Sequence, residues 1–399
     1  MSRLVYSATL ALFSLGSTLA YSYGSSQSQL AELALEKVLT DASPIFGVYQ
    51  DGKKPTSTWM KNYPDDTPIV HMNIPGVHDT QTWNYSLATQ QALDHITALD
   101  GEQMFPPEFF RCQEKPIISM LNDGIRAFDL RYAFDITNST LVFYHSQALQ
   151  SETATLEDVL FGYYQWLDDH PSEAVFVSLM YEGSTAIHAQ NDAAVQHELV
   201  RTLTTDAAMK YLNPVKDHLG TLGAARGKIT LFRRFDLDQL PASYTAEMPG
   251  LHFSPSNWTD NDPHIELVYN TKEHLTAYIE DFYDTNAPIG SPASLSIHWK
   301  YNATTANFLR AAHATGAKKD SLFWSFCSSE YTSNIPPETP KIQALGNGTL
   351  TPLGGVNQQL IPFFKSMKGK RLGIAMFDFY DQPSDLVQTF LDIQAPSHY

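Results

Sequence analysis

The sequence predicts a single-domain α/β protein whose parallel strands close into a distorted or incomplete barrel. Along the 399 residues, short runs rich in β-branched and aromatic residues alternate with segments of helical periodicity, a pattern typical of a parallel sheet covered by helices. About eight such runs are found, and most end in polar groups, as the strands of barrel enzymes do at the end that carries the chemistry.

The first residues have the features of a secretory leader. Arg3 supplies a positive charge, residues 4–15 are mostly apolar, and residues 18–20 form a plausible small-residue cleavage site. The apolar run is shorter than a membrane-spanning helix requires, and the C-terminus lacks the apolar tail of a lipid-anchor signal. We therefore expect a secreted, extracellular protein. The expected divisions are a signal peptide at 1–20, an N-terminal lead-in segment at 21–68 and a barrel domain at 69–395.

The first part of the barrel domain is expected to alternate strands and helices. Thr155 is a typical helix cap, and Asp158 follows at the spacing of a capping box. The aromatic stretch around Pro106 and Pro107 cannot continue a regular helix, so we expect a loop folded onto the body rather than a lipid-inserting rim. The expected strands are 69–73, 125–132, 140–144, 173–180 and 227–234, and the expected helices are 87–99, 117–122, 155–169 and 193–203.

The second part is expected to continue the alternation less regularly. A Gly- and Pro-rich loop at 334–355 separates its last two strands, of which the final one ends in Asp378. The expected strands are 265–269, 321–326 and 371–378, and the expected helices are 272–282, 298–313 and 382–391.

Composition narrows the range of partners. The formal net charge of −17 argues against nucleic acid, because phosphate backbones are bound by basic surfaces. Two cysteines, Cys112 and Cys327, are too few for a disulfide scaffold; one bridge and two buried thiols both remain open. Five glycosylation acceptor sites agree with a eukaryotic secretory route: Asn84, Asn138, Asn257, Asn302 and Asn347.

Titratable and cationic side chains stand at the ends of three of the first predicted strands. His78 and Asp79 follow the first strand, Asp129 and Arg131 end the second, and His145 ends the third. Two imidazoles can divide acid and base work near neutral pH, and a guanidinium can grip an anionic phosphodiester in bidentate fashion. This pattern favours cleavage of a phosphodiester.

An ordered set of motifs resembles the catalytic X domain of phosphatidylinositol-specific phospholipase C, in its bacterial and fungal secreted branch. The resemblance implies a distorted TIM-type (β/α)8 barrel and covers most of residues 69–380. The matching stretches are Ile74-Pro-Gly-Val-His-Asp-Thr80, Gly124-Ile-Arg-Ala-Phe-Asp-Leu-Arg131, Tyr144-His145, His170-Pro-Ser-Glu173, Ala225-Arg-Gly-Lys-Ile-Thr-Leu-Phe-Arg-Arg234 and the strand ending at Asp378.

The resemblance also implies roles. His78 would be the general base, oriented by Asp378, and His145 the general acid. Asp79 would support His145 and Arg131, and Arg131 would hold the phosphoryl oxygens. A neighbouring substrate hydroxyl would attack the phosphorus, giving a cyclic phosphate and a released lipid.

Further residues would support the site or bind the head group. Asp129 is expected to act as a supporting hydrogen-bond partner. Arg234 and Tyr269 match head-group positions, whereas Tyr181 stands where the bacterial enzymes carry a lysine. The sequence alignment places Leu267 where they carry an aspartate two residues before a ring-stacking tyrosine. The phosphate-handling set is therefore intact, and the head-group pocket is expected to be altered.

No cofactor or metal is expected. The calcium-dependent relatives carry an acidic residue where Arg131 stands, and a guanidinium would oppose a hard cation that seeks several oxygen ligands. The expected partner is a phospholipid or another phosphodiester, bound by a monomer that touches membranes transiently. Two alternatives remain: a metal-dependent glycerophosphodiester phosphodiesterase and a catalytically silent secreted barrel.

Overall fold

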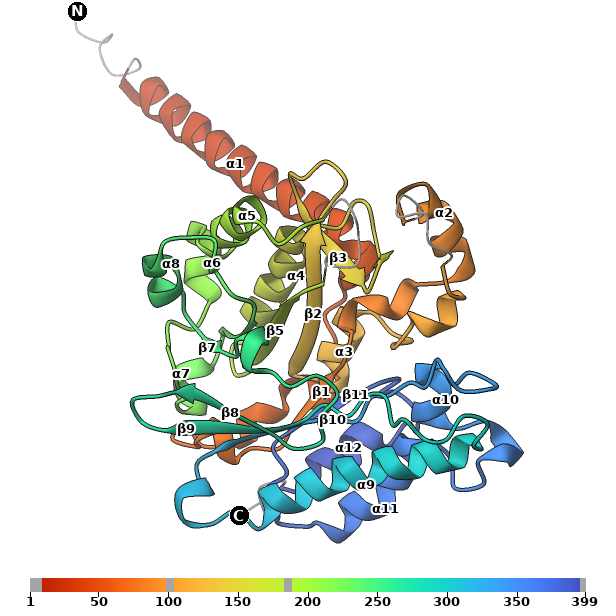
Figure 1. The fold of residues 1–399 in the computed structure, drawn as a ribbon. Helices are drawn as coiled ribbons and strands as arrows, with labels where there is room; N and C mark the ends of the chain where they lie inside the picture. The colour runs from red at the N-terminus through yellow and green to blue at the C-terminus, as the bar shows by residue number, and fades with distance from the viewer. Residues whose placement is uncertain (1–8, 98–103, 183–188, 395–399) are drawn as a thin grey trace, which may run out of the picture.

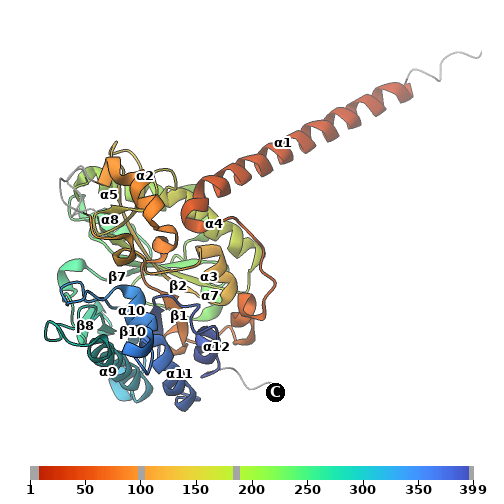
Figure 2. The same ribbon diagram turned by 90° about the vertical axis from the view of Figure 1, so that its right-hand side faces the viewer.

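The computed structural model describes residues 9–97, 104–182 and 189–394. Its body is a barrel-like sheet surrounded by helices, and helix α1 (Thr9–Phe46) projects away from that body in both views (Figures 1 and 2). The predicted signal peptide falls on residues 1–8, which lie outside the described residues, and on the first part of α1. Among the described residues, no helix is both long enough and apolar enough to cross a membrane.

Nine strands form one nearly closed sheet, which confirms the predicted distorted barrel. The first strand, β1, lies between β2 and the last strand, β11, so the two ends of the barrel domain meet in the middle of the sheet. The order of the nine strands across the sheet is β7 (Leu251–His252), β6 (Ile229–Arg234), β5 (Val175–Tyr181), β2 (Ala127–Phe134), β1 (Ile74–Val77), β11 (Ile374–Phe377), β10 (Leu322–Phe326), β9 (Leu275–Glu280) and β8 (Ile265–Asn270).

All neighbouring pairs in this order are parallel except β8 and β9, which form an antiparallel hairpin at one edge. Two more strands, β3 (Leu141–His145) and β4 (Ala148–Leu149), extend antiparallel from β2 outside the main path. The barrel strands point their carboxyl ends toward one side, where the site is built.

Helices cover the outside of the sheet, and α9, α11 and α12 pack together behind β9, β10, β11 and β1 (Figure 1). The capping box predicted at Thr155 and Asp158 is present at the start of α4. Besides α1, the helices are α2 (Leu87–Thr97), α3 (Ile117–Asp123), α4 (Leu156–Asp169), α5 (Ala193–Leu203), α6 (Asp206–Tyr211), α7 (Leu222–Ala225), α8 (Ala242–Glu247), α9 (Ala293–Ala312), α10 (Pro340–Leu345), α11 (Val356–Ser366) and α12 (Leu386–Leu391).

Two predicted elements were wrong. The first strand lies at β1, a few residues later than expected, because residues 69–71 form a 3-10 turn. The helix expected at 272–282 is strand β9. Its apolar residues suit either element, but the side-chain oxygen of Asn270 accepts hydrogen bonds from the backbone amides of Lys272 and Glu273. This turn sends the chain back along β8 as a hairpin.

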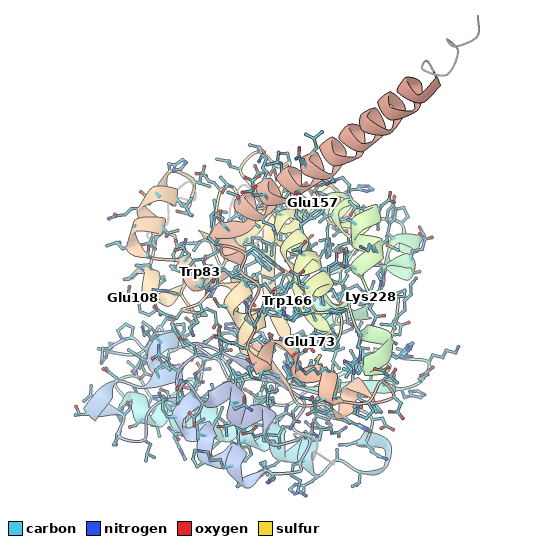
Figure 3. All side chains as sticks on the ribbon, turned by 180° about the vertical axis from the view of Figure 1, so that it is seen from behind. Trp83, Glu108, Glu157, Trp166, Glu173 and Lys228 are labelled. Carbon is cyan, nitrogen blue, oxygen red and sulfur yellow. The ribbon has the colours of Figure 1, made fainter. Side chains whose placement is uncertain are left out.

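A buried ion pair ties the lead-in segment to the barrel. The Arg126 guanidinium contacts Glu173 at 2.7 Å and lies over the ring of Trp166, 4.7 Å from its centroid. It also donates to the backbone carbonyl of Ser57 at 2.9 Å. Figure 3, which shows the molecule from behind, labels Trp166 and Glu173. Because one guanidinium joins the 3-10 segment at 55–62, β2 and the start of β5, this end of the barrel is fixed.

The lead-in segment also supplies part of the hydrophobic core. Ile45 and Phe46 at the end of α1 are fully buried, and Phe46 packs edge-on against Tyr163 of α4. Cys112 and Cys327 are both buried and free, which settles the question left open by the sequence in favour of two thiols.

Candidate active site

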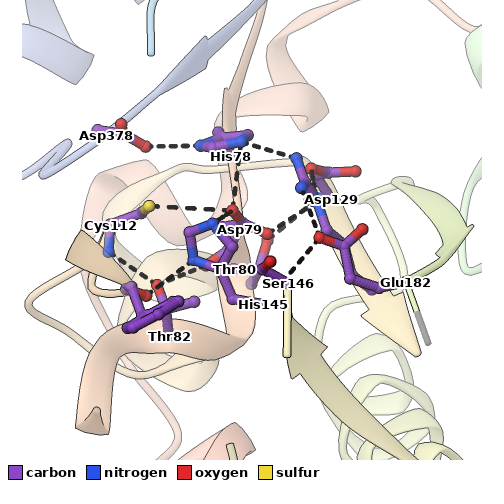
Figure 4. Close-up of polar contacts among 12 residues, drawn as sticks. His78, Asp79, Thr80, Thr82, Cys112, Asp129, His145, Ser146, Glu182 and Asp378 are labelled. Carbon is purple, nitrogen blue, oxygen red and sulfur yellow. Dashed lines mark hydrogen bonds and ion pairs between the residues drawn. The ribbon is translucent and has the colours of Figure 1, made fainter. Parts of the chain in front are cut away.

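The five residues predicted to be catalytic lie close together, and Figure 4 labels four of them: His78, Asp79, His145 and Asp378. Four of the five line a cavity of about 510 Å³, and Asp79 is buried beneath it. His78 and Asp79 directly follow β1, Arg131 lies in β2, His145 ends β3 and Asp378 directly follows β11.

Side-chain amides hold the two strand ends that carry His78 and Asp378. The Gln113 amide donates to the backbone carbonyls of His78 at 2.7 Å and Phe377 at 2.8 Å. The Asn357 amide donates to the backbone carbonyl of Asp378 at 2.8 Å. The Phe377 carbonyl also accepts from the backbone amide of His78 at 3.1 Å, so the side-chain amides extend the hydrogen bonding of the sheet past the ends of β1 and β11 and fix the backbone that carries both side chains.

His78 lies between a carboxylate and a guanidinium. Its Nδ1 is 3.0 Å from Asp378 Oδ1, and its Nε2 accepts from Arg131 Nη2 at 2.8 Å. Burial alone would lower the pKa of His78, but Asp79 and Asp378 raise it to about 9. The contact with Arg131 acts in the opposite direction, because it favours a neutral ring with Nε2 unprotonated.

Asp79 is shared by all three cationic groups. Its Oδ2 is 3.3 Å from His78 Nε2 and 3.2 Å from His145 Nε2, and its Oδ1 is 2.8 Å from Arg131 Nε. Burial alone would raise the pKa of Asp79, but Arg131, His145 and His78 hold it well below its ordinary range. Asp79 is therefore ionised, and its carboxylate holds the His78 and His145 rings next to the same oxygen atom.

His145 faces hydrogen-bond acceptors on both sides of its ring. Nδ1 is 2.9 Å from the backbone carbonyl of Phe110, and Nε2 faces Asp79. A carbonyl and a carboxylate accept only, so a doubly protonated imidazolium satisfies both contacts. This arrangement suits a proton donor.

Arg131 is fixed by three carboxylates. Besides Asp79, it contacts Asp129 at 3.3 Å and Glu182 at 3.2 Å. Burial would lower the pKa of Arg131, but these carboxylates raise it well above its ordinary value, so the guanidinium stays charged. The Glu182 carboxylate also accepts from the backbone amide of Ser146, at 2.9 Å. Glu182 therefore links the loop after β3 to Arg131, a role that the sequence analysis missed.

The opposite wall of the cavity can hold a polar head group. Arg234 lies over the ring of Trp258, 3.9 Å from its centroid, and contacts Asp129 at 3.4 Å. Asp281 and Tyr283 also line this wall, and the Tyr283 hydroxyl donates to Asp260. The aromatic faces and carboxylates suit a hydroxylated ring, whose faces are apolar and whose edge donates hydrogen bonds.

One head-group assignment changes. Tyr269 is buried against Phe253 in the core and does not line the cavity. Leu267 is buried in the core as well. Asp281 and Tyr283, which follow β9 and are also spaced two residues apart, line the cavity instead. They were missed because β9 was predicted to be a helix.

Tyr181, the residue assigned to the lysine position, reaches the cavity, and its hydroxyl donates to the backbone carbonyl of Ala189. Its neighbour Met180 also lines the cavity. Met180 pairs in register with Arg131 on one side and Arg234 on the other, so its side chain points into the barrel beside them. Neither residue adds a positive charge to the cavity.

Three of the site's side chains could also hold a metal ion. The ligand atoms of His78, Asp79 and Cys112 all lie within 4.8 Å of one another.

Fold and site together define a class: a barrel that presents two carboxylate-paired histidines around a fixed arginine. Comparisons with known proteins agree. Residues 91–235 match the family model described as phosphatidylinositol-specific phospholipase C, X domain. Arg131, His145 and Arg234 lie inside this match, while His78 and Asp378 lie on either side of it.

Relatives extend the likeness beyond the matched region. A 1-phosphatidylinositol phosphodiesterase of Staphylococcus aureus is 22% identical over 312 residues, which cover 72% of this chain and 83% of the relative. A PI-PLC X domain-containing protein 1 of Danio rerio is 33% identical over 141 residues, which cover 31% of this chain and 44% of that protein. The match therefore spans less than half of the zebrafish relative's length.

Solved structures show the same fold. A mutant of the phosphatidylinositol-specific phospholipase C of S. aureus has a TM-score of 0.65 at 18% identity, and the match covers 86% of this chain and 99% of that one. The enzyme of Listeria monocytogenes has a TM-score of 0.56 at 20% identity, with 85% and 98% covered. The predicted resemblance to the phosphatidylinositol-specific phospholipase C family is confirmed.

Proposed function

We propose that this protein is a secreted phospholipase C-like phosphodiesterase that cleaves a phosphatidylinositol-type lipid without a metal ion. The observation that carries the proposal is that His78 Nε2 and His145 Nε2 approach the same Asp79 oxygen, at 3.3 and 3.2 Å, with Arg131 alongside. Two proton-transfer groups thereby flank one position at the mouth of the barrel, where a phosphorus atom would sit.

The proposed steps follow from these contacts. His78 Nε2 removes the proton of a ring hydroxyl next to the phosphate, while Asp378 holds Nδ1–H. The hydroxyl oxygen attacks phosphorus, and Arg131 balances the charge that grows on the non-bridging oxygens. His145 gives its Nε2 proton to the departing alkoxide. The products are a cyclic phosphate and a diacylglycerol, and internal attack needs no activated water.

The direct test is release of diacylglycerol from vesicles that contain phosphatidylinositol, with and without a chelator. Activity on phosphatidylinositol that persists in the chelator, with none on phosphatidylcholine, supports the proposal, because choline has no neighbouring hydroxyl. Activity that is lost in the chelator and restored by a divalent cation favours the metal-dependent glycerophosphodiester alternative. No turnover of either lipid or of glycerophosphodiesters supports a silent barrel.

The pKa of about 9 for His78 predicts the pH dependence. The base must be neutral, so kcat/KM of the free protein should rise with pH along an ascending limb set by that value, before loss of the acid's proton lowers it again. In Asp378→Asn one of the two carboxylates that raise the pKa of His78 is removed, so the ascending limb should move to lower pH while the maximal kcat/KM falls. Asp260→Asn, in the same cavity, should leave the limb in place. A limb that moves to higher pH in Asp378→Asn would contradict the role of Asp378.

We also propose that the loops around the cavity touch the membrane. Ile289 and Ile335 are 67% and 72% exposed, and they follow β9 and β10 at the site's end of the barrel. Asn334 joins the two loops, because its amide oxygen accepts from the backbone amide of Gly290 at 2.8 Å. The aromatic stretch at 104–110 instead packs partly onto the body, with Phe110 buried.

Ile335→Asp should weaken vesicle binding roughly ten- to a hundredfold, since inserting one isoleucine side chain is worth about 1.5–3 kcal/mol. Turnover of a soluble, short-chain substrate should be nearly unchanged. Val268→Asp is the control, because Val268 is also exposed but pairs with Thr276 at the amino end of β9. Equal losses in the two variants, measured by vesicle sedimentation, would refute the proposed contact.

The proposal that the protein is secreted is supported by the predicted signal peptide and by the exposed glycosylation acceptor sites. All five acceptor asparagines are exposed, as glycosylation requires: Asn84, Asn138, Asn257, Asn302 and Asn347. Expressed in a eukaryotic host, the protein should reach the medium, begin after Ala20 and lose mass with a glycosidase. Retention inside the cell with Met1 in place would refute this proposal.

A further inference from the structure

A buried thiol lies beside the two histidines, and the proposed mechanism does not use it. Cys112 lines the cavity, and its Sγ is 3.9 Å from Asp79 Oδ2. The backbone amide of Cys112 donates to Thr82 Oγ1 at 2.9 Å, which fixes this part of the loop (Figure 4). The thiol therefore has a defined position next to the catalytic carboxylate.

The spacing of these groups suits a small coordination sphere. Asp79 Oδ2 is 3.3 Å from His78 Nε2 and 3.9 Å from Cys112 Sγ, and the ligand atoms of these three residues all lie within 4.8 Å of one another. Tetrahedral zinc, with bonds of about 2.0–2.3 Å, places its ligand atoms roughly 3.3–3.8 Å apart. Asp79 Oδ2 thus lies at nearly the required distance from one sulfur and one nitrogen.

We propose that His78, Asp79 and Cys112 form an inhibitory site for a thiophilic divalent cation such as Zn²⁺. Thiolates, imidazoles and carboxylates are the ligands that zinc takes in proteins, and three protein ligands leave a fourth position for water. Mg²⁺ and Ca²⁺ prefer six or more oxygens, and this set offers one carboxylate. On binding, the Cys112 thiol gives its proton to solvent. The inhibitory effect rests on the proposed function, whereas the binding does not.

Arg131 competes with a bound cation for His78 and thereby lowers the affinity of the site for the cation. Its Nη2 is 2.8 Å from His78 Nε2 and has to turn aside before a cation can take that nitrogen. Its other contacts, to Asp79 and Glu182, hold the guanidinium close by. Cation and substrate therefore need the same imidazole, that of His78, so inhibition by Zn²⁺ should be reversible and competitive with the phosphodiester.

Cd²⁺ is the direct probe, because a cadmium–thiolate bond absorbs in the ultraviolet. The purified protein and its variants Cys112→Ser and Cys327→Ser are titrated with Cd²⁺, after circular dichroism has shown that each is folded. The protein and Cys327→Ser, which keeps Cys112, should show the thiolate band. Cys112→Ser should lack it. No band in the protein, or an equal band in Cys112→Ser, would overturn the proposal.

Inhibition gives the second readout, with each variant compared with its own metal-free activity. Zn²⁺ should inhibit the protein and Cys327→Ser at the same concentration, and a chelator should restore the activity. Cys112→Ser, or Cys112→Ala if the serine variant does not fold, should need at least about tenfold more Zn²⁺. Equal inhibition of the Cys112 variant, or equal inhibition by Mg²⁺, would overturn the inhibitory role. An inactive protein that still shows the cadmium band would keep the site and refute the proposed function.

Discussion

Replacing His145 with alanine should lower kcat on phosphatidylinositol roughly a hundred- to ten-thousandfold, the usual contribution of one general acid. The reason is that the diacylglycerol alkoxide is a poor leaving group, and in the proposed mechanism it receives its proton from His145 Nε2, which lies beside Asp79 at the cavity. The loss should be in kcat rather than in KM, because the ring acts on the leaving oxygen in the transition state. Steady-state kinetics on mixed micelles measure both constants.

A second substrate separates the acid from a merely structural histidine. With a nitrophenyl leaving group, which departs without a proton, the loss in His145→Ala should be much smaller, whereas His78→Ala should be slow with both substrates. His313→Ala, at the end of α9, is the control for a histidine outside the site. Unchanged turnover of the natural lipid in His145→Ala, or equal losses on both substrates, would remove the acid assignment.

Replacing Arg131 with lysine should lower kcat roughly a hundred- to a thousandfold, although the positive charge is kept. A lysine has a single nitrogen and cannot contact Asp79, Glu182 and the phosphate together, so the charge is no longer fixed where the transition state needs it. The carboxylates of Asp79 and Asp129 also lose a partner in a buried place, so the free energy of unfolding should fall as well.

Arg234→Lys is the matched control, because Arg234 lies on Trp258 at the head-group wall rather than between the histidines. Its main effect should be on KM. Thermal unfolding of both variants, followed by circular dichroism, separates lost stability from lost catalysis. If Arg131→Lys stays folded and keeps kcat within a few-fold of the parent protein, Arg131 does not stabilise the transition state.

Two of the candidate catalytic groups, His78 and Asp378, could be predicted to lie together because they directly follow the parallel strands β1 and β11. Arg131 lies within β2, and His145 comes close to it because β3 returns antiparallel to β2. The helices were predicted best where local signals agree, as at the Thr155 cap of α4. These features depend on residues close together in the sequence.

The errors arose where long-range pairing decides the structure. Residues 272–282 have an apolar pattern that suits a helix, but pairing with β10 and with β8 makes residues 275–280 a strand. Because of this error, Asp281 and Tyr283, which follow β9 and line the cavity, were not predicted to belong to the site. Glu182 was missed for a related reason: its role depends on Arg131 and on the loop at Ser146, which are far away in the sequence.

Phosphorus NMR during turnover of phosphatidylinositol in the presence of a chelator tests the central claim most directly. If His78 and His145 promote internal attack without a metal ion, a cyclic phosphodiester resonance should appear before any acyclic phosphate, and it should be absent in His145→Ala on the same time scale. An acyclic phosphate that forms first, or a reaction that stops in the chelator, would contradict the account.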